Sequence, residues 1–265
     1  MGELLWLETC GSTNDEARAW WDALTEPVGR QPGGGPVGRQ PGGGPVGRQP
    51  GGVTIDAVAT DHQTGGRGRR GRAWFSPPGC GVYLSVIVRD TVRPAHAAVL
   101  PLLAGIVTAE FCISQGAVPV LKWPNDVLTT TPDGRKLAGI LCESRVEGDR
   151  LTAVVGIGLN LRTPPGGYPR ELNAAALETA LAPQSAARTL WRTFEGALAT
   201  LSSGDPFTEI VPAWMRLGPP LGVRIRSGDR VGAYAGLARD GALMLDTPDG
   251  PLRVDAGEVE MVGAF

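Results

Sequence analysis

The sequence predicts an α+β fold, in which a mixed α/β domain is followed by a small domain made only of strands. Over the first 218 residues, apolar runs of strand length alternate with longer helical stretches. From about Pro219 onward, short strand-like runs follow one another closely, separated by Gly/Asp turns. The 265-residue chain is 42% hydrophobic, which suffices for a proper core. We therefore expect one domain over residues 1–218 and a second over 219–265.

Local signals place the elements of the larger domain. Thr13 and Glu16, three residues apart, form a capping-box pattern at the start of a helix. Pro124 keeps its neighbour out of the helical region, and the Asn-Asp pair after it turns the chain. A polar hinge at 129–134 then leads into a long hairpin. We expect strands at 4–9, 53–60, 81–88, 118–122, 136–147 and 150–162, and helices at 14–24, 94–115, 184–202 and 206–217.

The C-terminal segment has a different texture. Its strand-like runs are short, and turns such as Ser-Gly-Asp at 227–229 lie between them. Closely spaced strands of this kind are typical of a small β-barrel. The expected strands are 222–227, 230–238, 241–247, 250–254 and 258–262.

Residues 27–52 repeat one nine-residue unit, Pro-Val-Gly-Arg-Gln-Pro-Gly-Gly-Gly, with the last copy truncated. A segment dominated by proline and glycine cannot build a packed core, and the copies are too few for a solenoid. We expect a flexible insertion outside the chemistry. Such an insertion costs little stability, because loop-closure entropy grows only logarithmically with length.

Charge and cysteine usage exclude several classes of protein. The formal net charge is -2, so nothing attracts the whole chain to nucleic acid or to an anionic membrane. The 4 cysteines show no metal-ligand spacing, which favours a reducing cytoplasm and no zinc site. The N-terminus lacks the basic flank of a signal peptide, and the apolar run 97–109 is too short to span a bilayer. We expect a soluble cytoplasmic protein.

The most unusual stretch is Gly-Arg-Gly-Arg-Arg-Gly-Arg at 66–72, followed by Trp74 and flanked by two expected strands. Guanidinium groups bind carboxylate or phosphate through forked hydrogen bonds, and glycine lets the backbone approach a ligand closely. This segment, the Gly/Arg loop, predicts a site for a polyanion. A solvated loop or a nucleic-acid-binding segment is the alternative, and the latter would bind less tightly as salt rises.

Motifs in a fixed order carry a resemblance to a known family. They are Ser-Thr-Asn at 12–14, Gln63 with the Gly/Arg loop, Lys-Trp-Pro-Asn-Asp at 122–126, Lys-Leu-Ala-Gly-Ile-Leu at 136–141 and Gly-x-Gly-x-Asn at 156–160. Together, and over essentially the whole chain, they resemble the biotin–protein ligases. The resemblance implies a catalytic biotin- and ATP-binding domain of the biotin/lipoate ligase type and a C-terminal SH3-like β-barrel. Because the motifs begin at residue 12, it implies the monofunctional type without an N-terminal DNA-binding domain.

The resemblance also implies a reaction. Biotin and MgATP form biotinyl-5′-AMP, and biotin then passes to a lysine of a biotin carboxyl carrier protein or domain. Unit charges about 4 Å apart repel by about 4 kcal/mol at an effective dielectric near 20, so fixed cations must bring the two anions together. No nucleic-acid or membrane partner is expected, and a homodimer is left open. The alternatives are a lipoate–protein ligase or octanoyl transferase, nucleic-acid binding through the Gly/Arg loop, and a silent biotin-binding protein.

Specific roles follow from the same resemblance. The implied catalytic residues are Arg67, Arg69, Lys136 and Asp126. The implied biotin-binding residues are Ser12, Thr13, Gln63, Gly66, Arg67, Arg69, Lys136, Gly139 and Gly156. The implied ATP-binding residues are Arg69, Arg72, Trp74, Asn125, Lys136 and Asn160.

Several of these residues keep a second interpretation. Asp126 could hold Mg²⁺, orient a lysine, accept the proton of the acceptor amine or only stabilise a turn, and no metal ligand is certain. Lys122 could pair with Asp126, Trp74 could be a core residue, and Arg70 is expected to face away from the site. His62 is interpreted as a surface residue.

Overall fold

The computed structural model describes residues 2–25, 55–131, 133–201 and 204–262, so the expected insertion at 27–52 lies outside the described residues. The helices are α1 (Thr13–Thr25), α2 (Val99–Ser114), α3 (Pro183–Thr200) and α4 (Phe207–Leu217), with short 3₁₀ turns at Arg69–Gly71 and Pro94–His96. The strands are β1 (Glu3–Trp6), β2 (Ile55–Thr60), β3 (Gly81–Arg89), β4 (Pro119–Lys122), β5 (Asp126–Thr129), β6 (Lys136–Glu147), β7 (Arg150–Asn160), β8 (Arg224–Ser227), β9 (Arg230–Leu237), β10 (Leu243–Thr247), β11 (Gly250–Val254) and β12 (Glu260–Met261).

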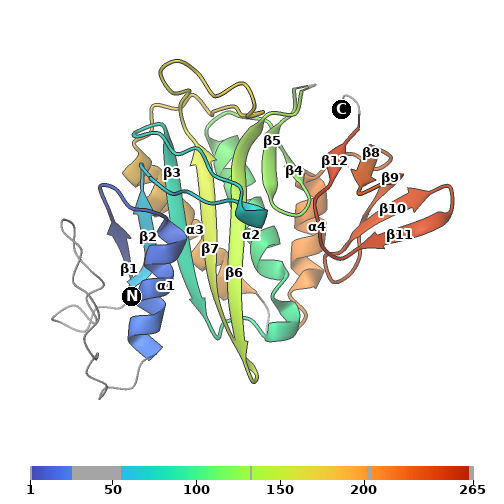
Figure 1. Ribbon diagram of the computed structural model, residues 1–265. Coiled ribbons are helices and arrows are strands. Elements are labelled where there is room, and N and C mark those ends of the chain that lie inside the picture. Colours follow the sequence, from blue (N-terminus) through green and yellow to red (C-terminus); the bar gives the residue numbers. More distant parts are fainter. Residues whose placement is uncertain (1, 26–54, 132, 202–203, 263–265) are drawn as a thin grey trace.

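The larger sheet has 7 strands in the order β1-β2-β3-β7-β6-β5-β4 (Figure 1). Strands β1 and β2 are parallel, and the other neighbours are antiparallel. Helices α2 and α3 pack against one face, where the main core lies. Helix α1 packs against part of the other face through Trp20 and Trp21. The rest of that second face is left for a site.

Alternation along the strands decides which residues reach each face. On β3, Leu84 and Val86 belong to the main core, whereas Ile87 packs under α1. Ser85 lies between Leu84 and Val86 in the strand. Successive side chains of a strand point to opposite sides, so Ser85 is on the α1 side. On β7 the same alternation places Val155 in the core and Gly156 on the α1 side.

The second sheet has 5 antiparallel strands in the order β11-β10-β9-β8-β12 (Figure 1). Its residues Ile225, Tyr234 and Leu243 belong to the same continuous core as the large sheet. Trp123 donates a hydrogen bond of 3.0 Å from Nε1 to the Gly241 carbonyl, which joins the two sheets directly. The predicted α+β class is confirmed, and the division at 218/219 stays a prediction.

One element differs from the expectation. The Asn-Asp pair was expected to turn the chain toward a polar hinge, but Asp126 already begins β5, which pairs with both β4 and β6. The reversal is tighter than expected because it needs only residues 123–125, with a cis peptide bond between Trp123 and Pro124. Burial of Val127 and Leu128 favours a strand between this reversal and the expected hinge at 129–134. None of the described helices has the length and apolar character needed to cross a bilayer.

Candidate active site

A cavity of about 610 Å³ lies on the α1 side of the large sheet. Its floor comes from β6 and β7, where alternation places small residues at Gly139, Gly156 and Gly158. The Gly/Arg loop forms one wall, the segment 168–174 forms another, and residues of the C-terminal sheet close the rim. The lining includes every predicted site residue except Gly66: Ser12, Thr13, Gln63, Arg67, Arg69, Arg72, Trp74, Asn125, Asp126, Lys136, Gly139, Gly156 and Asn160.

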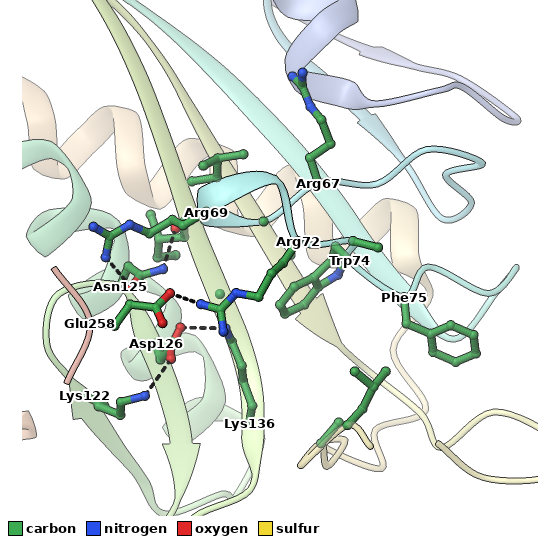
Figure 2. A pocket seen from close by; sticks show the side chains of 18 of the residues that line it. Arg67, Arg69, Arg72, Trp74, Phe75, Lys122, Asn125, Asp126, Lys136 and Glu258 are labelled. Atoms are coloured by element: carbon green, nitrogen blue, oxygen red, sulfur yellow. Dashed lines mark hydrogen bonds and ion pairs between the residues drawn. The ribbon is translucent and has the colours of Figure 1, made fainter. Parts of the chain in front are cut away.

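A carboxylate between two ammonium groups lies at one end of the cavity (Figure 2). One carboxylate oxygen of Asp126 lies 2.6 Å from Lys136 Nζ, and the other lies 3.2 Å from Lys122 Nζ. The Lys136 ammonium also lies 5.1 Å from the centre of the Trp74 ring, within range of a cation–π contact. The expected Lys122–Asp126 pair is therefore present, and Lys136 shares it.

Lys136 reaches this position because the ladder between β5 and β6 is irregular. Leu128 pairs with Lys136 and Val127 with Ala138, with a register shift between them, so β6 carries one extra residue. Ala138 points into the main core, and uninterrupted alternation would send Lys136 there as well. The bulge instead turns Lys136 to the cavity side.

The backbone of Lys136 is fixed on both sides. Its N–H donates to the Asn173 carbonyl at 2.8 Å, and its carbonyl accepts from the Ala175 N–H at 2.9 Å. Asn160 Nδ2 donates to that same carbonyl at 3.2 Å and to the Ala175 carbonyl at 2.9 Å. The amide group of Asn160 thus joins Lys136 on β6 to the segment that follows β7.

Burial and two cations act in opposite directions on Asp126. Burial works to raise the pKa of this carboxyl group, but the charges of Lys136 and Lys122 outweigh that effect and hold the pKa below its ordinary value. Asp126 is therefore a carboxylate at neutral pH, and a carboxylate with a lowered pKa is a weak base. The structure favours a role for it in holding the two lysines.

This ion triad predicts a pH-dependent contribution to stability. Because the folded-state pKa of Asp126 is lowered, its ion pairs stabilise the fold above pH ~4, and the gain is lost as pH falls through the folded-state pKa. The free energy of unfolding of the wild type should exceed that of Asp126→Asn most at neutral pH. Urea unfolding between pH ~3 and ~7 measures this difference, and a difference that stays constant over that range would contradict the assignment.

The arginines of the Gly/Arg loop point in different directions (Figure 2). Arg69 NH1 donates to Asn125 Oδ1 and to the Gly257 carbonyl, both at 3.1 Å. Burial, with a further contribution from Arg70, lowers its pKa from the ordinary arginine value. Arg72 pairs with Glu258 of the C-terminal sheet.

Arg67 points away from Arg69 and Arg72, toward helix α1. Its NH2 lies 2.7 Å from Asp15 Oδ1 and 3.6 Å from Glu143 Oε2. Arg67 and Arg69 were both predicted to lie beside the same anions, but only Arg69 lies toward the lysine end here (Figure 2). Arg70 is exposed and has no ion pair among the described residues, but it is one of the residues that line the cavity, so the expectation that it faces away from the site is not confirmed.

Trp74 lies against the glycines of the floor. A Cβ added at Gly158 would lie 2.7 Å from Trp74 Cε2, and one added at Gly139 would lie 2.8 Å from Cζ3. These two glycines are therefore required for the ring to lie on the sheet. Trp74 Nε1 and Arg67 Nε are buried donors without a hydrogen-bond partner among the described residues. Buried unpaired donors of this kind are uncommon in native proteins, and a ligand would satisfy them.

The other end of the cavity is polar and uncharged. Gln63 Oε1 accepts from the Thr13 N–H at 2.9 Å, and Gln63 Nε2 donates to Ser76 Oγ at 3.1 Å. Ser12 and Thr13 are buried beside them. A Cβ at Gly66 would lie 2.7 Å from Ser76 Oγ, so this glycine makes room for the network rather than lining the cavity.

Gly156 has a similar requirement. A Cβ there would lie 2.3 Å from Asn14 Oδ1, so its absence makes room for Asn14, to which the sequence analysis assigned no role. Asn125 Nδ2 donates to the Ile140 carbonyl at 3.0 Å, which ties the 123–125 reversal to β6. His62 is not among the lining residues and lies 2.6 Å, at Nδ1, from Thr9 Oγ1.

Sequence reasoning missed several lining residues. Tyr83 and Gly158 lie on predicted strands, and the alternation of β3 and β7 could have placed them on the cavity side. The segment 168–174 gave no signal, because it has neither periodicity nor a motif. Glu258 and Glu260 lay in the expected second domain and were not considered part of the site.

The fold and the cavity together define a class of protein in which one large sheet carries a cavity suited to a small molecule and a second anion. The large sheet carries a cavity with a neutral polar end, an aromatic floor and a cationic end. Such a cavity suits a small molecule that has a polar head and a carboxylate, together with a second anion.

Comparison with known proteins agrees with this class. Residues 54–160 match the model of the Biotin/lipoate A/B protein ligase family. The chain is 33% identical over 217 residues to the Biotin--[acetyl-CoA-carboxylase] ligase of Paracoccus denitrificans, with 76% of this chain and 88% of that protein covered. It is 31% identical over 219 residues to the Bifunctional ligase/repressor BirA of Bacillus subtilis (strain 168), with 77% of this chain and 65% of that protein covered. The chain belongs to the Biotin/lipoate A/B protein ligase family.

A solved structure supports the fold. The biotin protein ligase from Aquifex aeolicus in complex with biotin and ATP matches with a TM-score of 0.70 at 23% identity, covering 99% of this chain and 100% of that chain. At this identity the match shows that the fold is shared. This chain spans 65% of the length of the Bacillus subtilis relative.

Proposed function

We propose that this protein is a biotin–protein ligase, which joins biotin to the α-phosphate of ATP and then transfers biotin to a lysine of a carrier protein. The observation that carries the proposal is one continuous cavity that joins the polar Thr13–Gln63 end to the cationic Lys136 end. The polar end suits a ureido ring, and the cationic end suits a carboxylate beside a phosphate. Both relatives named above are ligases by name, and one is a biotin ligase.

In the first step, the biotin carboxylate oxygen attacks the α-phosphorus of ATP, and pyrophosphate leaves. Two anions must approach each other, so the fixed charges of Lys136 and Arg69 would lower their repulsion most where negative charge builds up. Asp126 keeps Lys136 in place at 2.6 Å. Trp74 would supply a flat face for adenine, and Asn125 and Asn160, which line the same cavity, would supply polar contacts.

In the second step, the acceptor amine attacks the biotinyl carbonyl carbon, and AMP leaves. The amine must lose a proton, and a lysine in water has a pKa near 10.4. Asp126 is a poor base for this purpose because its own pKa is lowered. We therefore assign Asp126 to positioning of the lysines. We assign no residue of the protein as the base that takes the proton of the amine.

Magnesium enters this proposal with ATP. Each carboxylate oxygen of Asp126 faces a lysine ammonium group, so a metal ion bound there would compete with Lys122 and Lys136. The described residues contain no cluster of three or more His, Cys, Asp or Glu side chains that could hold a metal ion. Mg²⁺ commonly binds through substrate phosphates with few protein ligands, and here it would be held by the phosphates of ATP.

The proposed acceptor is a biotin carboxyl carrier domain of acetyl-CoA carboxylase or a related enzyme, in the cytoplasm. The rival substrates, lipoate and octanoate, lack the N–H groups that the polar end could bind. A nucleic-acid role for the Gly/Arg loop is less well supported, because Arg67, Arg69 and Arg72 are each engaged within the protein.

Biotin transfer to a purified carrier domain with MgATP tests the proposal. We expect labelling of the carrier, no labelling when its acceptor lysine is replaced by arginine, and no transfer of lipoate or octanoate under the same conditions. Arg69→Ala should slow transfer strongly, because Arg69 is a half-buried cation in the proposed reacting end of the cavity. Absence of biotin transfer by the intact protein would refute the function.

A further inference from the structure

Among the residues that the structure describes, one carboxylate in the cavity wall has no ion-pair partner. The carboxylates that line the cavity are Asp126, Glu171, Glu258 and Glu260. Asp126 pairs with two lysines, and Glu258 and Glu260 each pair with an arginine. Glu171 is exposed, and no lysine or arginine of the described chain neutralises it. Its charge is therefore free to act on a guest of the cavity.

This charge does not help the first step of the proposed reaction. That step brings two anions together, and an unpaired negative charge in the wall would repel both of them. The second step brings a cation, because a lysine side chain has a pKa near 10.4 in water and reaches the protein protonated. Glu171 therefore has the charge that suits the acceptor of the second step.

The backbone that carries Glu171 is anchored to β6. The Leu172 N–H donates to the Pro169 carbonyl at 2.9 Å, which closes a turn that contains Glu171. The carbonyl of Asn173, two residues after Glu171, accepts from the Lys136 N–H at 2.8 Å. Glu171 thus lies on a turn held next to Lys136, in an exposed part of the cavity wall.

Apolar residues accompany Glu171 in this part of the wall. Leu172 and Phe75 line the same cavity and are 36% and 38% exposed. The Phe75 ring lies 6.3 Å from the Tyr168 ring, edge to face, so the chain after the Gly/Arg loop meets the segment 168–174 there. A lysine side chain lays its apolar stem along such surfaces and keeps its charged end near water. The wall therefore offers a place for both parts of a lysine side chain.

We infer that Glu171 binds the ammonium group of the acceptor lysine as the carrier docks, with the stem of that lysine on Leu172 and Phe75. The contact precedes the transfer, so no bond forms or breaks at Glu171. The ammonium group then leaves Glu171 and loses its proton before the amine attacks. This inference rests on the proposed function, because the acceptor lysine is a substrate of that reaction.

The affinity for a carrier domain tests the contact directly. Calorimetry on the full chain, without ATP so that no transfer occurs, compares a carrier that has its acceptor lysine with one in which glutamine replaces it. The glutamine carrier should bind the wild type about threefold to fivefold more weakly, as expected for an exposed ion pair. The two carriers should bind Glu171→Gln equally, because the partner of the lysine is then missing.

Kinetics of the two steps separate this role from a structural one. Glu171→Gln should lower kcat/KM for the carrier by about threefold to fivefold, and more than it lowers pyrophosphate exchange, which involves no carrier. Glu171→Arg places a like charge opposite the ammonium group and should lower kcat/KM for the carrier at least about tenfold. Glu110→Gln makes the same change of charge at an exposed position of α2, which packs on the other face of the sheet. It is the matched control, with both rates unchanged.

Three outcomes would overturn the inference. Equal binding of the two carriers by the wild type, or a preference for the lysine carrier that persists in Glu171→Gln, would refute the contact and leave the ligase function standing. A fall in pyrophosphate exchange as large as the fall in transfer would refute it too, because Glu171 would then act before the carrier arrives. Failure of the wild type to transfer biotin to the carrier at all would refute the proposed function, and this inference with it.

Discussion

Replacing Lys136 with alanine is expected to slow formation of biotinyl-5′-AMP by at least about 100-fold. A preorganised charge at a site of developing charge is typically worth about 10²–10³ in rate. Lys136 is held by Asp126 at 2.6 Å and by backbone hydrogen bonds on both sides, so its ammonium group has a fixed position in the cavity. Exchange of labelled pyrophosphate into ATP in the presence of biotin measures this step without the carrier protein.

The adjacent Arg135→Ala is the matched control for this experiment. Arg135 pairs with Asp133 and does not line the main cavity, so its removal should leave the exchange rate within about twofold of the wild type. Equal rates of pyrophosphate exchange for Lys136→Ala and the wild type would show that the ion triad takes no part in the reaction.

Replacing Gly158 with alanine is expected to weaken ATP binding and to lower the stability of the fold. The added Cβ would lie 2.7 Å from Trp74 Cε2 and 2.8 Å from Nε1, so the ring must leave the floor. Overpacking typically costs about 1–3 kcal/mol of stability. Stacking of a base on an aromatic ring is worth about 1–3 kcal/mol, so ATP should bind about tenfold to a hundredfold more weakly.

Gly196→Ala is the control for this substitution. Gly196 lies in α3, where an added Cβ meets nothing within 4 Å, and alanine favours a helix by up to about 1 kcal/mol. The melting temperature should therefore rise or stay unchanged in Gly196→Ala and fall in Gly158→Ala. Calorimetry should show weaker ATP binding in Gly158→Ala only. Unaltered ATP binding in Gly158→Ala would mean that Trp74 does not form the adenine platform.

Much of the site could be predicted because ordered motifs resemble those of a known family, and strand alternation explains why the structure brings several of them together. Residues 12–13, Gln63 and the Gly/Arg loop stand next to expected strands, and the structure brings them to one cavity. The alternation of β7 explains why Gly156, Gly158 and Asn160 share a face while the residues between them form the core.

The remainder depended on features that sequence patterns do not encode. Lys136 reaches the cavity only through an irregular β5–β6 register, and simple alternation would bury it. Arg67 differs from Arg69 because Asp15 and Glu143 lie within reach of it, which is a long-range consequence of α1 docking. The segment 168–174 joins the wall through backbone bonds to Lys136, and such bonds do not depend on side-chain identity.

The contacts of Gly257 and Glu258 with Arg69 and Arg72 have a practical consequence for protein engineering. A hybrid enzyme that takes its last fifty or so residues from another ligase would inherit a foreign partner for these two arginines. Such hybrids should therefore express and fold yet turn over poorly, and exchanging the Gly/Arg loop along with the tail should restore turnover.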